Sequence, residues 1–133
     1  MSVKNIIHVD DHVDILLLAK LALERLGVFS VRTCTSGAEA LQTTIDFPPD
    51  LILLDVMMPE MNGPETLRAL RARKATRTTP VIFVTATLGA EDRAYYKRLG
   101  SIGVVAKPLD HRTFATTIAA LYSGNWSQLK PAA

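Results

Sequence analysis

The stretch Asp50-Leu51-Ile52-Leu53-Leu54-Asp55 decides the fold of this chain. It is a short, almost uniformly aliphatic run that follows Pro48-Pro49, which is typical of a strand buried on both faces in a parallel sheet. The carboxylate of Asp55 then stands at the carboxyl end of a buried strand, where open α/β folds bind ligands. Asp55 is a candidate nucleophile, metal ligand or helix cap, and the other residues at that edge decide among these roles.

Four more strand-like segments recur along the chain and alternate with segments of helical periodicity. The second of them, 28–34, is more polar and is predicted to lie at the sheet edge. Gly27 and Gly100 end two of the helical segments. Strands are predicted over residues 3–9, 28–34, 50–55, 80–85 and 102–106, and helices over 13–26, 37–46, 64–73, 90–99 and 110–122. Short connections of this kind favour parallel strands with right-handed crossovers. We therefore expect an α/β fold, a three-layer αβα sandwich of flavodoxin-like topology with a five-stranded parallel sheet of order 2-1-3-4-5.

Residues 1–122 are predicted to form one domain, and the polar segment 123–133 is predicted to be a loosely held tail. Helical spacing predicts which side chains face the sheet. For the first helix the predicted inward residues are Ile15, Leu18, Ala19, Ala22, Leu23 and Leu26. The second helix, capped by Ser36, is predicted to turn Ala38, Leu41 and Ile45 inward.

Composition excludes several classes of protein. The chain has 133 residues, 48% hydrophobic and 21% charged, and contains no apolar run of the length of a membrane span and no signal-peptide pattern. With Cys34 as the single cysteine, a reducing, cytoplasmic setting is the simplest interpretation. Net charge is +2, and the clustered basic residues fall on predicted helices, where solvated faces are expected. No nucleic-acid-binding motif is present, so neither nucleic acid nor membrane is expected as a partner.

Polar side chains follow four of the predicted strands and should converge at one edge of the sheet. They are Asp10 and Asp11 after the first strand, Asp55, Thr85 and Lys107 after the third, fourth and fifth. Three carboxylates in one cleft repel one another, and a hard divalent cation such as Mg²⁺ removes that repulsion and also takes a phosphoryl oxygen. Together with an ammonium group and a hydroxyl, these are the parts needed for phosphoryl transfer onto Asp55.

Each of these residues also has an ordinary interpretation. The two aspartates after the first strand are suitable helix caps, Asp55 a turn residue, Thr85 a cap, and Lys107 a solvated loop lysine. Their convergence from distant parts of the chain favours the functional interpretation. His8 is expected to be a core or edge residue, and His12 an exposed loop histidine beside the cleft.

The same residues resemble the receiver domain of two-component response regulators, in its chemotaxis-type, single-domain form. The resemblance covers residues 3–122 and is carried by Asp10-Asp11, by Asp55 within Leu51-Ile52-Leu53-Leu54-Asp55-Val56-Met57-Met58-Pro59, by Thr85-Ala86 and by Lys107-Pro108. It implies a Mg²⁺ site formed by Asp11, Asp55 and the backbone carbonyl of Met57, with Asp10 assisting. It also implies Asp55 as phosphoacceptor, Thr85 as switch hydroxyl, Lys107 as phosphate contact, and a commonly cis Lys107–Pro108 bond.

This resemblance predicts a single-domain regulator that takes a phosphoryl group from a sensor histidine kinase or a histidine phosphotransfer protein. It would act on a downstream protein target, as a signalling switch or a phosphorelay intermediate. Beyond Mg²⁺-dependent self-phosphorylation and slow self-dephosphorylation no enzyme activity is expected. The alternatives are a receiver-like interaction module that works without phosphorylation, the isolated receiver of a larger regulator, and a small phosphatase. The last is disfavoured because Met57, like Thr87, carries no carboxylate that would act as acid or base.

Two features depart from the family pattern or leave a choice open. Val104 stands where the family usually has an aromatic residue, so readout is expected to use the loop after Thr85 and the fourth helix, where Tyr95 and Tyr96 lie. The outer side of the first helix carries Leu16, Leu17 and Leu21, which are either buried, or a docking surface for a phosphotransfer partner, or a self-association face.

Overall fold

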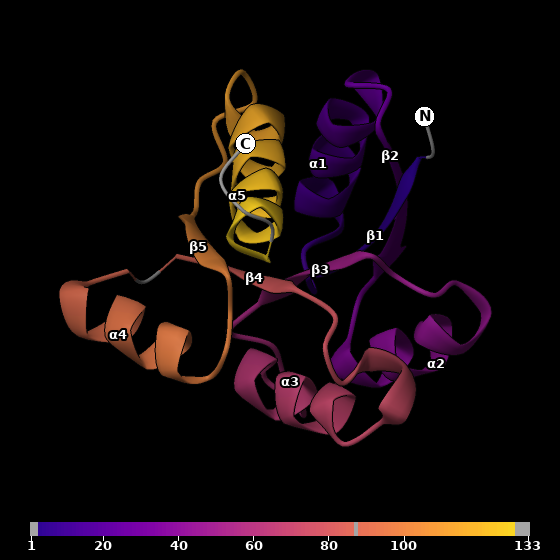
Figure 1. Ribbon diagram of the computed structural model, residues 1–133, viewed down its shortest axis with the longest axis vertical. Helices are drawn as coiled ribbons and strands as arrows, with labels where there is room; N and C mark the ends of the chain where they lie inside the picture. The colour runs from indigo at the N-terminus through magenta and orange to yellow at the C-terminus, as the bar shows by residue number, and fades with distance from the viewer. Residues whose placement is uncertain (1–2, 87, 130–133) are drawn as a thin grey trace.

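The structure, a computed structural model, describes residues 3–86 and 88–129. Its five parallel strands form one sheet of order β2-β1-β3-β4-β5, which confirms the predicted topology (Figure 1). The strands are β1 (Lys4–Val9), β2 (Phe29–Cys34), β3 (Leu51–Asp55), β4 (Val81–Thr85) and β5 (Gly103–Ala106). The helices are α1 (Val13–Arg25), α2 (Gly37–Asp46), α3 (Gly63–Arg71), α4 (Ala90–Arg98) and α5 (Phe114–Leu129), with a short 3₁₀ helix, η1 (Lys74–Thr76), after α3.

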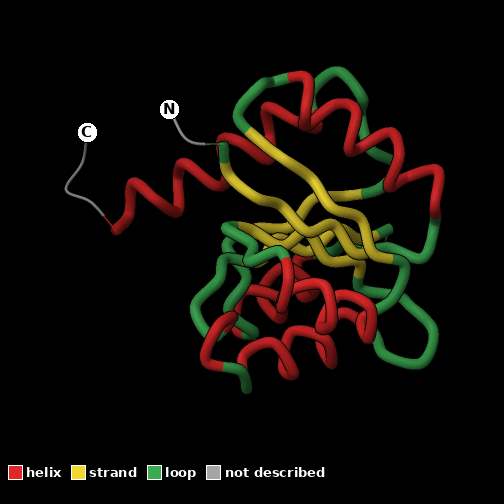
Figure 2. The backbone as a smooth tube through the Cα atoms, turned by 90° about the vertical axis from the view of Figure 1, so that its right-hand side faces the viewer, coloured by secondary structure: helices red, strands yellow, loops and turns green. Residues whose placement is uncertain are grey.

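The helices cover both faces of the sheet. Helices α1 and α5 pack on one face and α2, α3 and α4 on the other, so that the strands lie between two helical layers (Figures 1 and 2). Every residue of β3 and of β4 is buried, whereas the edge strand β2 exposes Arg32 and Thr33. Central strands covered on both faces need apolar side chains throughout, which explains the uninterrupted aliphatic runs.

The pairing register brings the carboxyl ends of the strands into line. Val9 at the end of β1 pairs with Cys34 of β2 and with Leu54 of β3. Asp55 pairs with Val84, and Thr85 with Ala106. The residues at or just beyond these ends therefore share one edge of the sheet, where the sequence predicted the site.

Helix α1 is rotated about its axis relative to the prediction. Its buried residues are Leu16, Ala19 and Leu23, whereas Leu18 is 61% exposed and Leu26 is 39% exposed. The prediction that these last two residues face the core was wrong. Because apolar residues occur all around α1, its sequence contains no polar stripe that would fix the rotation.

The outer leucines of α1 were predicted to be either buried or part of an exposed docking or self-association surface, and they differ in this respect. Leu16 is buried, but Leu17 and Leu21 are 58% and 57% exposed, so burial is excluded for these two. In helix α2, Ala40 and Thr44 are buried. Ala38 and Ile45, which were predicted to face inward, are exposed, so that prediction was wrong. Thr44 tolerates burial because its hydroxyl donates to the carbonyl of Leu41 at 2.8 Å.

The ends of the helices follow local hydrogen bonding. Asn62 and Glu65 cap α3 reciprocally, at 2.9 and 3.0 Å. The start of α5 is later than the predicted residue 110, because Asp110 forms a turn in which its side chain accepts from the backbone N–H of Arg112 at 2.9 Å. Helix α5 also continues to Leu129, past the predicted end at residue 122, and residues 130–133 of the predicted tail lie outside the described part.

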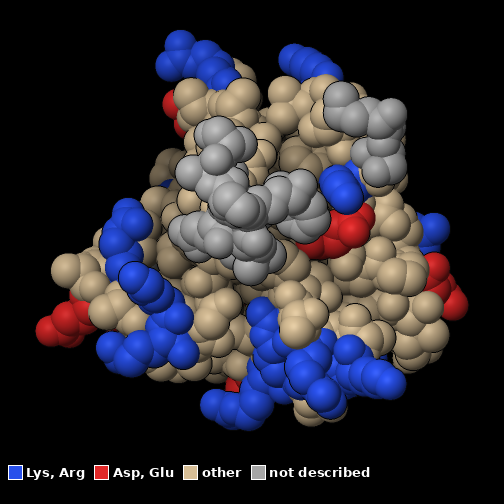
Figure 3. Space-filling model, viewed as in Figure 1, with Lys and Arg blue, Asp and Glu red and all other residues tan. Residues whose placement is uncertain are grey.

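The basic side chains gather over α3, η1 and α4, as the space-filling view shows (Figure 3). Two of them have structural contacts. Arg71 donates to the carbonyl of Thr79 at 2.6 Å, and Arg73 to the carbonyl of Leu41 at 2.6 Å. Of the helices in the described ranges, none has both the length and the apolar character that a membrane crossing requires.

Candidate functional site

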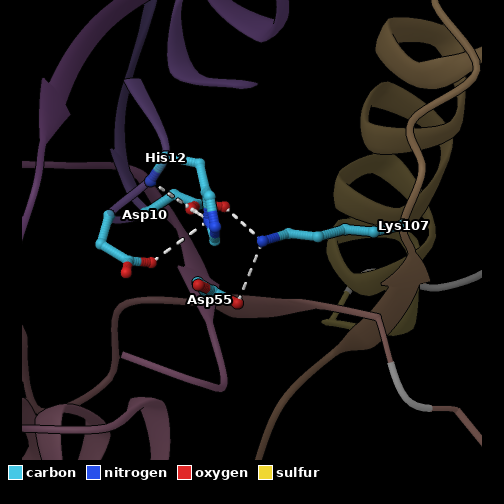
Figure 4. Close-up of polar contacts among 5 residues, drawn as sticks. Asp10, His12, Asp55 and Lys107 are labelled. Carbon is cyan, nitrogen blue, oxygen red and sulfur yellow. Dashed lines mark hydrogen bonds and ion pairs between the residues drawn. The ribbon is translucent and has the colours of Figure 1, made fainter. Parts of the chain in front are cut away.

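Three strand ends bring charged side chains into contact. Asp10 follows β1, Asp55 ends β3, and Lys107 follows β5 (Figure 4). The Lys107 ammonium lies 2.7 Å from Asp10 Oδ2 and 3.2 Å from Asp55 Oδ1. The side chains of both aspartates are almost fully buried and that of Lys107 is 10% exposed. The lysine therefore bridges two carboxylates that would otherwise repel each other.

His12 lies beside the two aspartates that precede it. Its Nδ1 is 3.0 Å from Asp10 Oδ1 and 3.3 Å from Asp11 Oδ1, and its backbone N–H donates to Asp10 at 2.9 Å. The histidine is exposed, as predicted, but its ring contacts the acidic group, which the sequence did not indicate. The hydrogen bond to Asp10 and the charge of Asp11 raise the pKa of His12.

The pKa values of the two buried carboxylates shift in opposite directions. Burial raises the pKa of Asp55, and the negative charge of Asp10 raises it further, with Lys107 offsetting part of the increase. Burial acts in the same sense on Asp10, but hydrogen bonds from Lys107 and His12 outweigh it and lower the pKa of Asp10. The same contacts with Asp10 and Asp55 overcome the effect of burial on Lys107 and raise its pKa. Lys107 is therefore held as a cation beside Asp10 as an anion, while Asp55 is the carboxylate whose charged form is less stabilised.

The donor set fits a hard divalent cation. Ligand atoms of Asp10, Asp11, His12 and Asp55 all lie within 4.8 Å of one another. Asp55 Oδ2 is buried, and among the described residues no side chain or backbone group hydrogen bonds to it. A buried carboxylate oxygen without a partner is costly, and a metal ion is one means of satisfying it. The acidic cluster is thus suited to Mg²⁺, as the resemblance implied.

Thr85 joins the site through β5 and α4. Its backbone carbonyl accepts from the N–H of Lys107 at 2.8 Å, so β4 fixes where the lysine leaves the sheet. Its side chain is hydrogen bonded to the hydroxyl of Tyr96, a buried residue of α4 whose ring centroid is 5.0 Å from that of Phe83. Thr85 is therefore linked to a tyrosine of α4. Val104 of β5, which stands where the family usually has an aromatic residue, is only partly buried.

Gly63 allows α3 to begin directly against the end of β3. A Cβ atom at this position would lie 2.5 Å from the backbone oxygen of Asp55, and the Gly63 N–H donates to the carbonyl of Val56 at 2.9 Å. Only glycine permits this approach of two backbones. Gly63 is not among the predicted site residues, although its place before Pro64 at a helix start is a usable signal.

The structure brings most of the predicted site residues together. Asp10, Asp11, Asp55 and Lys107 form one cluster with His12, and Thr85 borders it through Lys107. The Lys107–Pro108 peptide bond is cis, as the resemblance implied.

His8 is buried in the core. The side chain of Met57 is 71% exposed, its backbone N–H hydrogen bonds to the Asp55 carboxylate, and its carbonyl stays a predicted ligand. Thr87 lies outside the described residues.

The fold and this acidic cluster are typical of a receiver domain, and the family comparison agrees. The model of the response regulator receiver domain matches residues 6–119. The chain belongs to this family.

The chain is similar to several curated relatives and solved structures. It is 40% identical over 124 residues to the transcriptional regulatory protein CpxR of Escherichia coli strain K12, a match that covers 92% of this chain and 51% of CpxR. It is 35% identical over 118 residues to the alkaline phosphatase synthesis transcriptional regulatory protein PhoP of Bacillus subtilis, covering 89% and 48%. The chain thus spans about half the length of these relatives. The chemotaxis response regulator CheY4 of Vibrio cholerae superposes with a TM-score of 0.82 at 28% identity, covering 90% of this chain and 99% of that one.

Proposed function

We propose that this chain accepts a phosphoryl group on Asp55 and works as a phosphorylation-dependent switch. The observation that carries this proposal is the asymmetric setting of the Asp55 carboxylate. Its Oδ1 lies 3.2 Å from the Lys107 ammonium, while its buried Oδ2 has no hydrogen-bond partner among the described residues. The carboxylate thus has one oxygen open to Mg²⁺ and a second, Oδ1, that attacks phosphorus once Lys107 transfers its contact to a phosphoryl oxygen.

The remaining residues have roles in positioning and charge neutralisation, on which phosphoryl transfer mainly depends. Asp11, Asp55 and the Met57 carbonyl would hold Mg²⁺, with Asp10 assisting. When bound, Mg²⁺ neutralises charge on the transferred phosphoryl group. Lys107 moves its ammonium from the carboxylates to a phosphoryl oxygen, and the Thr85 hydroxyl donates to another. As the new oxygen–phosphorus bond forms, the bond from phosphorus to the donor's histidine nitrogen breaks, and the imidazole leaves.

Receiver domains have histidine kinases as partners. For this chain we propose a sensor histidine kinase or a histidine phosphotransfer protein as phosphodonor, and a downstream protein as target. The chain then serves as a single-domain switch or phosphorelay intermediate, or as the receiver part of a longer regulator. Self-dephosphorylation is slow, because the exposed thioether of Met57 offers no acid or base near Asp55.

Intact-mass measurement tests this function. Incubation with Mg²⁺ and a small phosphodonor such as acetyl phosphate should add one phosphoryl group to the wild-type chain. Asp55→Asn should abolish the labelling, and Asp11→Asn should reduce it strongly. Asp14→Asn is the matched control, because Asp14 is an exposed carboxylate in the first turn of α1. This variant should take up the phosphoryl group as the wild type does. Labelling that persists in Asp55→Asn, or is absent from the wild type, would refute the proposal, and the decay of the label measures its lifetime.

A further inference from the structure

The outward side of α1 is apolar in the middle and charged at both ends. Leu17, Leu18 and Leu21 are 58%, 61% and 57% exposed. Asp14 precedes them by about one turn and Arg25 follows by about one turn, and both are exposed. Neither charge forms an ion pair within the part of the chain that the structure describes. A surface helix normally places polar residues on this side, so these five residues, the α1 ridge, form an unpartnered face.

The spacing of the ridge is that of a helix–helix seam. Asp14, Leu18, Leu21 and Arg25 follow one another at intervals of four, three and four residues. This alternation keeps the side chains along one line of the helix surface, as in the contact line of paired helices. The order of the charges along that line then determines the orientation of a partner helix.

We propose that the α1 ridge forms a two-fold symmetric dimer in which α1 packs antiparallel against α1 of a second copy. With Leu18 of one copy opposite Leu21 of the partner subunit, Asp14 faces Arg25 of the partner subunit. The two-fold axis repeats both contacts, so the interface contains two opposite-charge pairs around a leucine centre. A parallel pairing would instead place equal charges together at each end. The ridge is therefore complementary to itself in the antiparallel orientation alone.

The neighbouring surface has space for the partner's leucines. A groove of about 490 Å³ borders the ridge, with Leu18, Leu21 and Leu26 on its α1 side and Ala115 on its α5 side. The paired helices are about 20 Å long. Such a contact buries less than the roughly 1,200–2,000 Å² of a standard stable interface. The dimer should therefore be reversible, with a dissociation constant in the micromolar range.

The dimer has a consequence for the site. Helix α1 begins immediately after His12, so a second copy on the ridge covers the surface next to the acidic cluster. A helical phosphodonor protein that approaches Asp55 from this side would compete with the second copy. This consequence rests on the proposed phosphoacceptor function, whereas the dimer itself does not.

Exchange of the charges tests both the interface and its orientation. Sedimentation of the full chain over a hundredfold range of concentration should show a monomer–dimer equilibrium for the wild type. Asp14→Arg and Arg25→Asp should each weaken dimerisation by about tenfold, since two attractive contacts become repulsive. The double variant exchanges the charges and should regain most of the wild-type affinity. In a parallel dimer the double variant would show no such recovery.

Two further variants complete the test. Leu21→Glu should abolish the dimer, and Ile45→Glu on α2, which changes a side chain that is 62% exposed, should leave it intact. Circular dichroism verifies that each variant is folded. A wild type that stays monomeric at all concentrations would overturn the proposal and leave the ridge for a phosphotransfer partner. Failure of the double variant to recover, or loss of the dimer in Ile45→Glu, would overturn it as well. Asp55→Asn should dimerise like the wild type, so failure of the phosphoacceptor proposal is recognised separately.

Discussion

Asp10 and Asp55 are both buried carboxylates at one edge of the sheet, yet their pKa values shift in opposite directions. The difference follows from distance and hydrogen bonding. Lys107 is closer to Asp10, at 2.7 Å, and His12 donates to Asp10 through its backbone. Asp10 is thereby fixed as an anion, whereas Asp55 keeps one oxygen without a partner. The residue with the less stabilised charge is the better candidate for a nucleophile.

At the same scale, His12 should control how pH affects metal binding. Its contacts raise its pKa, so that near pH 6 the ring is an imidazolium that competes with Mg²⁺ for Asp10 and Asp11. As the pH rises this positive charge is lost, and Mg²⁺ should bind about threefold to tenfold more tightly near pH 8 than near pH 6. Calorimetric titration with Mg²⁺ measures the effect, and His12→Gln should reduce it. His111→Gln, at an exposed histidine of the loop before α5, is the control and should behave as the wild type. A pH dependence that persists in His12→Gln would assign it to another group.

At the scale of elements, strands were easier to predict than helix faces. β3 and β4 are buried on both faces, so a continuous apolar run identifies them without reference to their neighbours. The rotation of α1 depends on which of its many leucines the sheet and α5 accommodate, and the sequence contains no polar stripe that decides this. For the same reason the exposure of Leu18 could not be predicted from periodicity.

Helix α4 is the element that we expect to read the state of the site. In place of an aromatic residue at Val104, Tyr96 of α4 hydrogen bonds through its hydroxyl to the side chain of Thr85. If Thr85 donates to a phosphoryl group on Asp55, that bond must change, and α4 changes with it. Hydrogen exchange over residues 90–98 should differ between the phosphorylated and the unmodified chain, and Tyr96→Phe should reduce that difference by more than half.

Tyr95→Phe is the matched control for this experiment. Tyr95 is 41% exposed and its ring lies 5.6 Å from that of Tyr96, so its hydroxyl is not expected to contribute. Both variants should take up phosphate normally, since neither tyrosine belongs to the acidic cluster. The loss of one hydrogen bond should lower the stability of Tyr96→Phe by about 1 kcal/mol. An unchanged exchange pattern in Tyr96→Phe would show that α4 responds by another route.

At the scale of the whole molecule, the site is connected to both helical layers. Asp10 and His12 lead directly into α1, while Thr85 leads through Tyr96 into the α2–α4 layer. The sequence predicted the edge at which these residues meet, because strand ends and topology determine it. It did not predict the contacts of His12 or Tyr96, because these depend on side-chain rotamers and on the rotation of a helix. We therefore expect phosphorylation to be reported on one face of the sheet and α1 to govern association on the other.

The buried ring of His8 is expected to make the folded protein less stable in acid. Its ring is fully buried on β1, and neither ring nitrogen has a hydrogen-bond partner among the described residues. Burial lowers the pKa of His8 from 6.5 to about 4, with Asp10 opposing this shift and Lys107 adding to it. The unfolded chain therefore binds a proton at a higher pH than the folded chain does. Stability is lost as the pH falls from about 6.5 toward 4, by up to about 3 kcal/mol from this residue.

Replacement of His8 by leucine should remove this part of the acid sensitivity. Leucine has a similar size, and no hydrogen bond is lost, so His8→Leu should be at least as stable as the wild type near pH 7. Urea unfolding with EDTA present, at a series of pH values from about 7.5 to 4.5, should give a flatter dependence of the unfolding free energy on pH for His8→Leu. His111→Gln replaces an exposed histidine and should retain the wild-type slope. If the curves of His8→Leu and the wild type ran parallel, the acid sensitivity in this pH range would belong to a group other than His8.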